Sequence, residues 1–230
     1  MHLFYVPDYA GGILPEEESL HAVKVLRLQG GDIIQIIDGC GGFHQAVITV
    51  PHPKKCGFQI ESSEFEYGKR NYRLHVAIAP TKNIERFEWF VEKAVEIGVD
   101  EITPLFCRYS ERKTINPERI QKIIVSAAKQ SLKAYMPVLH PLTTLKSFIN
   151  QTKPASAFIA HCYPGDKYEY HQQLKNQDDI CIMIGPEGDF SEEEVETALT
   201  AGYLPVSLGS SRLRTETAGV VACTVAGFCR

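Results

Sequence analysis

The sequence lacks the features of membrane and secreted proteins. No stretch of its 230 residues contains about 18 consecutive apolar side chains, the length that a membrane-spanning helix requires. The N-terminal segment, residues 1–8, lacks the basic region and the long apolar run of a secretory signal. We therefore expect a cytoplasmic protein.

The sequence also lacks the patterns of disulfide-linked and metal-binding proteins. The seven cysteines are odd in number and form no Cys-x-x-Cys pair, which argues against a disulfide framework and a structural zinc site. The eight histidines are scattered without the spacing of metal ligands. We therefore expect no bound metal.

Three common ligand-binding and catalytic motifs are absent as well. The chain has no Gly-Lys-Ser/Thr of a phosphate-binding loop, no Gly-x-Gly-x-x-Gly and no Gly-x-Ser-x-Gly. Its glycine-rich segment, residues 184–191, instead carries Glu187 and Asp189, which would repel a phosphate. Such a loop favours a neutral or cationic ligand. S-adenosylmethionine, with its sulfonium and ammonium groups, is such a ligand.

Two stretches near the C-terminus, residues 180–191 and 204–218, share one pattern. Each is a short apolar run, then a loop of small residues, then the start of a helix. Strand–loop–helix units place their loops at the carboxyl edge of a parallel sheet, where open α/β sheets bind ligands. Ser191 and Glu194 form a capping box, which predicts a helix from Ser191 to Ala201. The alternative is an ordinary strand-to-helix turn, because one glycine-rich turn is a weak signal.

Residues 1–70 are predicted to form a small β-barrel with one helix at about residues 15–28. Within that helix His21, Lys24 and Arg27 recur at a spacing of three, so they would share a face that meets either RNA or solvent. The β-prone runs are residues 2–6, 33–38, 43–50 and 58–65.

From residue 71 onward the pattern changes to alternating strands and helices, which predicts an α/β domain with a mostly parallel sheet covered on both faces. The boundary is expected in the polar segment 66–71. Strands are expected at residues 74–80, 101–107, 155–161, 180–184 and 204–208. Helices are expected at residues 84–98, from Asn116-Pro117 onward, 191–201 and 216–228.

The net charge of −4 does not by itself indicate nucleic-acid binding, but the charged residues are unevenly distributed along the chain. Residues 107–133 carry seven Lys/Arg and two Asp/Glu, a balance of +5, whereas residues 148–230 carry six and eleven, a balance of −5. A basic segment in an acidic chain is either a phosphate-facing surface or a solvated helix face.

Three C-terminal motifs, Ile184-Gly185-Pro186-Glu187-Gly188, Leu208-Gly209 and Leu213-Arg214-Thr215-Glu216-Thr217-Ala218, closely resemble those of the RsmE family. These are ribosomal RNA methyltransferases of the SPOUT superfamily. Segments within residues 82–104, 126–131 and 21–32 also resemble the family, so the resemblance covers nearly the whole chain. Asp189, where many members have glycine, and Arg212, where they tend to be apolar, depart from it, and their roles are open.

The resemblance implies a PUA-like β-barrel that binds RNA over residues 1–70. It also implies a SPOUT methyltransferase domain over residues 71–230, with a trefoil knot in about residues 155–230. It further implies a homodimer that methylates N3 of a uridine in 16S ribosomal RNA of the small subunit, with S-adenosylmethionine as the donor. The alternatives are a SPOUT methyltransferase for another RNA, such as transfer RNA, and a non-catalytic RNA-binding assembly factor.

The resemblance also suggests site residues. Arg214 would stabilise negative charge on the uridine, because arginine stays protonated, and Glu187 would be a base, a sulfonium partner or a cap of its own loop. The cofactor-binding candidates are His161, Ile184, Gly185, Pro186, Glu187, Gly188, Leu208, Gly209, Leu213, Arg214, Thr217 and Ala218. The RNA-binding candidates are Lys24, Arg27, Lys82, Arg108, Arg112, Lys113 and Lys129.

Overall fold

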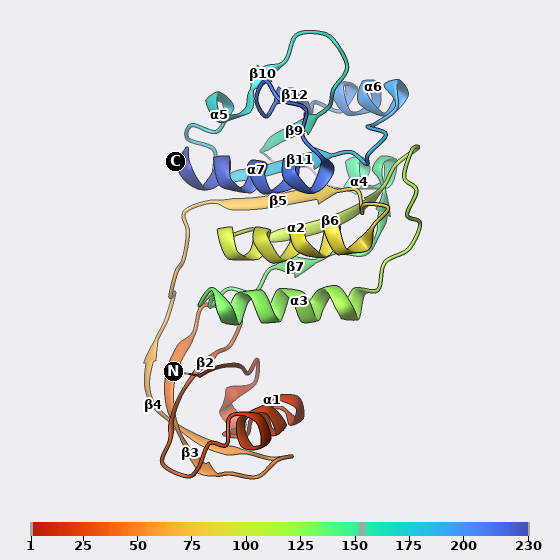
Figure 1. The fold of residues 1–230 in the computed structure, drawn as a ribbon. Helices are drawn as coiled ribbons and strands as arrows, with labels where there is room; N and C mark the ends of the chain where they lie inside the picture. The colour runs from red at the N-terminus through yellow and green to blue at the C-terminus, as the bar shows by residue number, and fades with distance from the viewer. Residues whose placement is uncertain (1, 152–154, 230) are drawn as a thin grey trace. The chain divides into compact units, whose positions relative to one another are not determined.

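The computed structural model describes residues 2–151 and 155–229, so the expected domain ranges extend over residues 1, 152–154 and 230, which lie outside the described residues. The chain divides into two compact units (Figure 1). The first comprises residues 1–69 and 125–136, and the second comprises residues 70–124 and 137–230. Among the described helices, none is both long and apolar enough to cross a membrane.

The first unit contains a four-stranded sheet in the order β1-β2-β3-β4. Its strands are β1 (Leu3–Tyr5), β2 (Ile33–Ile37), β3 (Phe43–Val50) and β4 (Gly57–Glu64). Strand β1 is parallel to β2 and the other pairs are antiparallel. Alternate side chains of β2 and β3 point into a core with Phe4 and Leu14, as the period of two in a strand requires. All four strands expected here are confirmed, while closure into a barrel stays a prediction.

The helix expected over residues 15–28 is shorter than the pattern predicted. A short 3-10 turn, η1 (Tyr9–Gly11), precedes helix α1 (Glu16–Leu20), which continues as one π-helical turn, η2 (His21–Val25). Arg27 lies beyond the helix with a positive φ of 58°. The expectation that Arg27 shares a helix face with His21 and Lys24 is therefore wrong, because the wide turn lets the chain bury Leu28 instead.

The glycine-rich segment between β2 and β3 does more than turn the chain. Its backbone pairs with residues 134–136 of the same unit, through Gly41 N–H to Ala134 O and Met136 N–H to Gly39 O, each at 2.9 Å. Gly41 has a φ of 100°, and a Cβ there would lie 2.4 Å from the ring of Tyr135. Only glycine therefore permits this close approach.

The second unit contains a parallel sheet of eight strands in the order β10-β12-β9-β11-β5-β6-β7, with β8 paired to β6. Because both faces are covered, its central strands β5 and β11 are mostly apolar and do not alternate between apolar and polar residues. The strands are β5 (Arg73–Ile78), β6 (Glu101–Phe106), β7 (Val138–Leu139), β8 (Thr143–Thr144), β9 (Ser156–Ala160), β10 (Tyr168–Glu169), β11 (Asp179–Ile184) and β12 (Leu204–Ser207).

Helices cover both faces of this sheet (Figure 1). Helices α4 (Leu145–Gln151) and α6 (Glu192–Thr200) pack with Ala77, Cys181 and Met183, whereas α7 (Thr215–Phe228) packs with α2 (Ile84–Ile97) and with the opposite face of β5. Helix α3 (Pro117–Gln130) begins in the second unit and ends in residues assigned to the first, and the short α5 (Tyr170–Gln173) belongs to the second. All the expected strands and helices of this unit are confirmed, while α4, α5, β7, β8 and β10 were not predicted.

Two of the predicted helix boundaries rest on capping groups that the structure places as expected. The Ser191 hydroxyl accepts from the Glu194 N–H at 3.2 Å and the Glu194 carboxylate accepts from the Ser191 N–H at 2.8 Å, a complete capping box. The Asn116 side chain accepts from the Arg119 N–H at 3.1 Å at the start of α3.

Strand β11 lies between β5 and β9 although it follows both in the chain. The carboxyl ends of β12, β9, β11 and β5 are therefore neighbours along one edge of the sheet. The loops that leave these four strands meet there.

Candidate functional site

The candidate site is built from the loops at this carboxyl edge. Residues 79–83 follow β5, residues 161–167 follow β9, residues 185–191 follow β11 and residues 208–214 follow β12. Both C-terminal stretches singled out from the sequence thus end at the same edge, as predicted.

A buried threonine joins two of these loops. Thr215 is the first residue of α7, and its hydroxyl donates to the carbonyl oxygen of Gly185 at 3.0 Å. The contact holds the start of α7 against the loop after β11. Thr215 was part of the Leu213–Ala218 motif, but the sequence had no signal that singled out its hydroxyl.

Glu187 connects the loop after β11 to the loop after β5. Its Oε1 accepts a hydrogen bond from the backbone N–H of Lys82 at 2.9 Å. The carboxylate therefore binds a neighbouring loop. It does not cap its own loop, which was one interpretation of the sequence. The side chain remains exposed, so its second oxygen is accessible.

Asp189 has a structural role that the sequence left open. Its φ is 66°, in the left-handed region that aspartate tolerates better than most residues. Its Oδ2 accepts from the Cys162 N–H at 2.7 Å and its Oδ1 accepts from the Phe190 N–H at 2.8 Å. The Tyr163 hydroxyl also donates to the Phe190 carbonyl at 2.8 Å. Asp189 and Tyr163 therefore bind the loops after β9 and β11 to each other.

His161, directly after β9, offers an unpaired polar atom at this edge. Its Nδ1 is buried and has no hydrogen-bond partner among the described residues. Burial lowers the pKa of His161, and Lys167 lowers it further. A neutral imidazole with a free nitrogen is suited to bind a polar ligand group.

The other cofactor candidates are compatible with S-adenosylmethionine. Ile184, Gly185, Pro186 and Ala218 are buried, whereas Leu208, Leu213 and Thr217 are half-buried. Gly209 is exposed with a φ of 124°, and a Cβ there would meet nothing within 4 Å. A polar nitrogen, half-buried leucines and open glycine backbone fit a ligand with an adenine ring and a polar tail.

Arg214 lies at an open cavity of about 610 Å³ beside these loops. It is the exposed N-cap residue of α7. Nearby, Arg86 and the buried Glu216 form an ion pair at 3.9 Å, and Glu216 Oε2 has no hydrogen-bond partner among the described residues. The cavity is lined by Asn83, Glu85, Arg86, Trp89, Arg212, Leu213, Arg214, Glu216 and Thr217.

The basic side chains proposed to bind RNA fall into two groups. Arg112 donates to the carbonyl oxygens of Thr81 and Lys82 at 2.9 and 2.6 Å, and Lys82 pairs with Glu111 at 2.7 Å. Lys129 pairs with Glu18 at 2.6 Å. The side chains of Arg112 and Lys129 thus have intramolecular partners, and their contact with phosphates stays a prediction. Among the RNA-binding candidates, Lys24, Arg27, Arg108 and Lys113 are exposed and form no ion pair with another described residue.

Comparisons with known proteins agree over nearly the whole chain. A family described as RNA methyltransferase domain matches residues 68–227, and one described as RNA methyltransferase PUA domain matches residues 14–61. The Ribosomal RNA small subunit methyltransferase E of Rickettsia conorii is 29% identical over 91% of this chain and 86% of its own length.

Two solved structures have the same fold. The probable rRNA-methyltransferase from Porphyromonas gingivalis is 45% identical, with a TM-score of 0.87 over 97% of this chain and 95% of its own. The Ribosomal RNA small subunit methyltransferase E from Neisseria gonorrhoeae, bound to S-adenosyl methionine, is 26% identical, with a TM-score of 0.80 over 97% and 95%.

Proposed function

The chain belongs to the RNA methyltransferase family, and from this we propose that it methylates N3 of a uridine in 16S ribosomal RNA of the small subunit, with S-adenosylmethionine as the methyl donor. The observation that carries the proposal is the match of nearly the full chain to relatives named as small-subunit methyltransferases. The relative solved with S-adenosyl methionine supports the choice of donor.

We propose that the donor is held by the loops after β9, β11 and β12. The unpaired Nδ1 of His161 would bind a polar group of the ligand, and the half-buried Leu208 and Leu213 would contact its apolar surface. The Thr215 hydroxyl holds the loop from Ile184 to Gly188 against the start of α7. S-adenosylmethionine, when bound there, supplies a methyl group activated by the sulfonium.

Because the donor is already activated, the protein's contribution is chiefly to orient the acceptor. The N3–H proton of the uridine must leave so that the nitrogen lone pair can accept the methyl group. Arg214, exposed at the cavity beside the loops, would stabilise the negative charge that develops on the ring. It remains protonated and does not take the proton itself.

Glu187 is proposed as a catalytic or donor-binding residue whose position is set by the Lys82 N–H. One oxygen is engaged by that backbone group, and the other is free to accept a proton or to lie near the sulfonium. The Glu187 carboxylate would thus order a loop with one oxygen and contribute negative charge with the other.

We propose that the first unit binds RNA. The match of residues 14–61 to the PUA domain of RNA methyltransferases supports this role. The exposed candidates for phosphate contacts in the first unit are Lys24 and Arg27, and we propose that Arg108 and Lys113 of the second unit contact RNA as well. A ribosomal substrate implies a cytoplasmic location. Lys82, Arg112 and Lys129 would act mainly through their intramolecular contacts.

We further propose a homodimer and a trefoil knot in the second unit. The position of β11 between β5 and β9, which both precede it in the chain, is compatible with such a knot. The exposed Phe228 and the half-buried Val220 and Val221 on α7 support a second copy as the partner of that helix.

The function is tested by incubating the protein with methyl-labelled S-adenosylmethionine and small-subunit particles that lack the modification, followed by nucleoside analysis. We expect labelled N3-methyluridine in the 16S ribosomal RNA. Label in transfer RNA alone would favour a SPOUT methyltransferase with another substrate. Absence of both label and donor binding in calorimetry would favour a non-catalytic RNA-binding assembly factor.

A further inference from the structure

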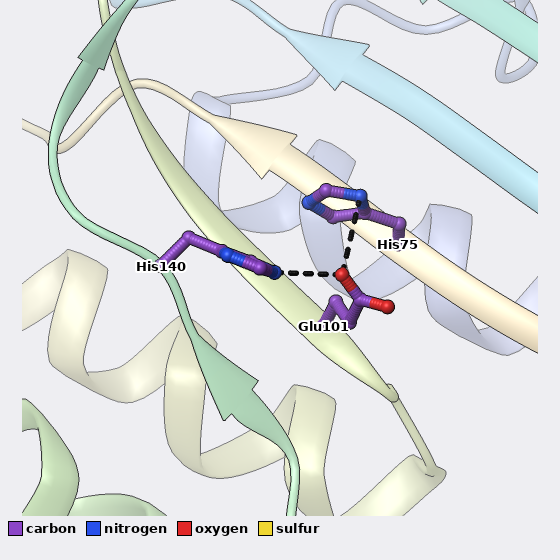
Figure 2. A group of neighbouring side chains, drawn as sticks. All are labelled: His75, Glu101 and His140. Atoms are coloured by element: carbon purple, nitrogen blue, oxygen red, sulfur yellow. Dashed lines mark hydrogen bonds and ion pairs between the residues drawn. The ribbon is translucent and has the colours of Figure 1, made fainter. Parts of the chain in front are cut away.

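Three titratable side chains meet at the amino edge of the second unit's sheet, opposite the loops described above (Figure 2). His75 lies near the start of β5, Glu101 is the first residue of β6 and His140 directly follows β7. His75 is paired in register with Glu101, and the His140 N–H donates to the Ile102 carbonyl at 2.9 Å. Parallel pairing therefore brings the three side chains together.

One oxygen of Glu101 lies between the two imidazoles (Figure 2). Its Oε2 is 2.6 Å from His140 Nε2 and 3.8 Å from His75 Nδ1. The three candidate ligand atoms all lie within 4.8 Å of one another. The arrangement is compact enough for one ion to contact all three.

His75 has an unpaired nitrogen directed at this point. Its side chain is only 5% exposed, and its Nε2 is hydrogen-bonded to the Thr103 hydroxyl at 2.7 Å. Its Nδ1 is buried without a hydrogen-bond partner among the described residues. A buried polar atom left unpaired costs about 1–3 kcal/mol, so a buried imidazole nitrogen normally has a partner.

The surroundings favour a cation. Arg73 binds the other oxygen of Glu101 at 2.6 Å and lies 3.7 Å from Asp179. One arginine and two carboxylates give this cavity of about 430 Å³ a net charge of −1 when both imidazoles are neutral. Thr103 and Arg73 hold the His75 ring and the Glu101 carboxylate in place, as partners of metal ligands commonly do.

We propose that His75 Nδ1, Glu101 Oε2 and His140 Nε2 bind one divalent transition-metal ion, of which zinc is the best candidate, with water completing the coordination. Two imidazoles and one carboxylate are a known ligand set for zinc, and they also suit non-haem iron. Tetrahedral zinc sets its ligand atoms about 3.4 Å apart. When the ion replaces the proton between Glu101 and His140, the distance from Glu101 Oε2 to His140 Nε2 should therefore increase from 2.6 Å. The distance from Glu101 Oε2 to His75 Nδ1 should decrease slightly from 3.8 Å.

The ion would stabilise the fold and take no part in methyl transfer. The site lies at the amino ends of β5 and β6, whereas the loops proposed to hold the donor lie at the carboxyl ends of β9, β11 and β12. An ion here would fasten the short β7, at the end of the strand order, to β5 and β6.

The test is a calorimetric titration of Zn²⁺ into the full-length, metal-free protein. We expect one ion per chain in the wild type. The variant His140→Gln removes one of the three ligands and should weaken zinc binding by more than roughly 100-fold. Loss of a residue that only hydrogen-bonds to a ligand already costs about 10–100-fold in metal affinity. His140 is 37% exposed, so this variant should fold. His171→Gln, at an exposed histidine of α5, is the matched control and should bind like the wild type.

Two further variants separate this site from adventitious binding. Thr103→Val should weaken binding by about 10–100-fold, because it removes the group that orients His75. Cys162→Ser, at an exposed thiol, should bind zinc like the wild type. Zn²⁺ should raise the melting temperature of the wild type and of His171→Gln, but not of His140→Gln. The proposal is overturned if the wild type binds no stoichiometric zinc, or if His140→Gln binds it equally well.

Discussion

At the residue scale, Arg214 and Arg212 differ in their expected importance although both line the same open cavity. Arg214 is the N-cap residue of α7 and directly precedes Thr215, which is bound to the Gly185 carbonyl. Arg212 lies two residues earlier, outside the helix and its cap. The start of α7 therefore holds Arg214 close to the loop after β11, which is proposed to bind the donor.

We predict that Arg214→Ala lowers the single-turnover methylation rate by roughly 10²–10³-fold and changes donor affinity only a few-fold. A contact that strengthens in the transition state affects the rate more than ground-state binding. Arg214→Lys should recover only part of the rate, because lysine keeps the charge but not the planar fork. Arg212→Ala is the control and should stay near the wild-type rate. A defect of Arg214→Ala confined to donor binding would contradict the assigned role.

Glu187 can be tested by separating its charge from its hydrogen bond. We predict that Glu187→Gln keeps the contact to the Lys82 N–H and so preserves the loop, but loses most of the methylation rate if the carboxylate is the proton acceptor. Glu187→Ala should in addition weaken donor binding, because it frees the loop. Rate measurements and donor titrations of both variants distinguish the two effects. A Glu187→Gln enzyme with wild-type rate would leave the residue a purely structural role.

At the element scale, α7 packs against α2 through a row of small buried residues. The packing is tight at Gly219: a Cβ there would lie 2.5 Å from the ring of Phe90 on α2 and 2.9 Å from Ile78 on β5. Phe90 and Ile78 are fully buried and cannot move aside. The distance between the helices is therefore set by this glycine.

We predict that Gly219→Ala lowers the free energy of unfolding by about 1–3 kcal/mol through overpacking. Gly227→Ala in the same helix is the matched control, because its Cβ would lie 3.7 Å from the Tyr72 hydroxyl, an ordinary contact. Alanine favours helix over glycine by about 1 kcal/mol, so the control should be neutral or more stable. Urea denaturation measures both. Equal stability of the two variants would show that α2 and α7 are not packed as described.

At the scale of the whole molecule, we predict a dimer at micromolar concentration in sedimentation experiments. Phe228, at the end of α7, is 84% exposed and is expected to contact the second copy. Phe228→Asp should shift the protein toward monomer and lower its activity. Phe65→Asp, at a phenylalanine of the first unit that is 66% exposed, is the control. A wild-type monomer with full activity would rule out the dimer.

We also predict that RNA binding weakens as salt concentration rises, because phosphate contacts release counterions. The double charge reversal Arg108→Glu and Lys113→Glu should weaken RNA binding at unchanged donor affinity and reduce the salt slope by about 1 for each lost contact. Lys146→Glu, at an exposed lysine of α4, is the control. Unchanged RNA affinity in the double variant would place the RNA elsewhere.

The sequence by itself determined the local structure and the family. Apart from the helix expected over residues 15–28, which is shorter, the expected strands and helices are present, because apolar periodicity and the Ser191 and Glu194 capping box act within a few residues of each other. The resemblance to small-subunit RNA methyltransferases, read from short motifs near the C-terminus, is confirmed by the comparisons. Where a local pattern failed, as at Arg27, the burial of Leu28 overrode it.

Only the tertiary structure decided which distant groups meet. The Lys82 N–H binds Glu187, residues 134–136 pair with the Gly39 segment, and Lys129 pairs with Glu18. The histidines looked scattered in the sequence, yet His75 and His140 flank Glu101. Each of these contacts depends on the register between strands or on the crossing of segments far apart in the chain. Local periodicity carries no information on either, because it reports only which face of its own element a residue occupies.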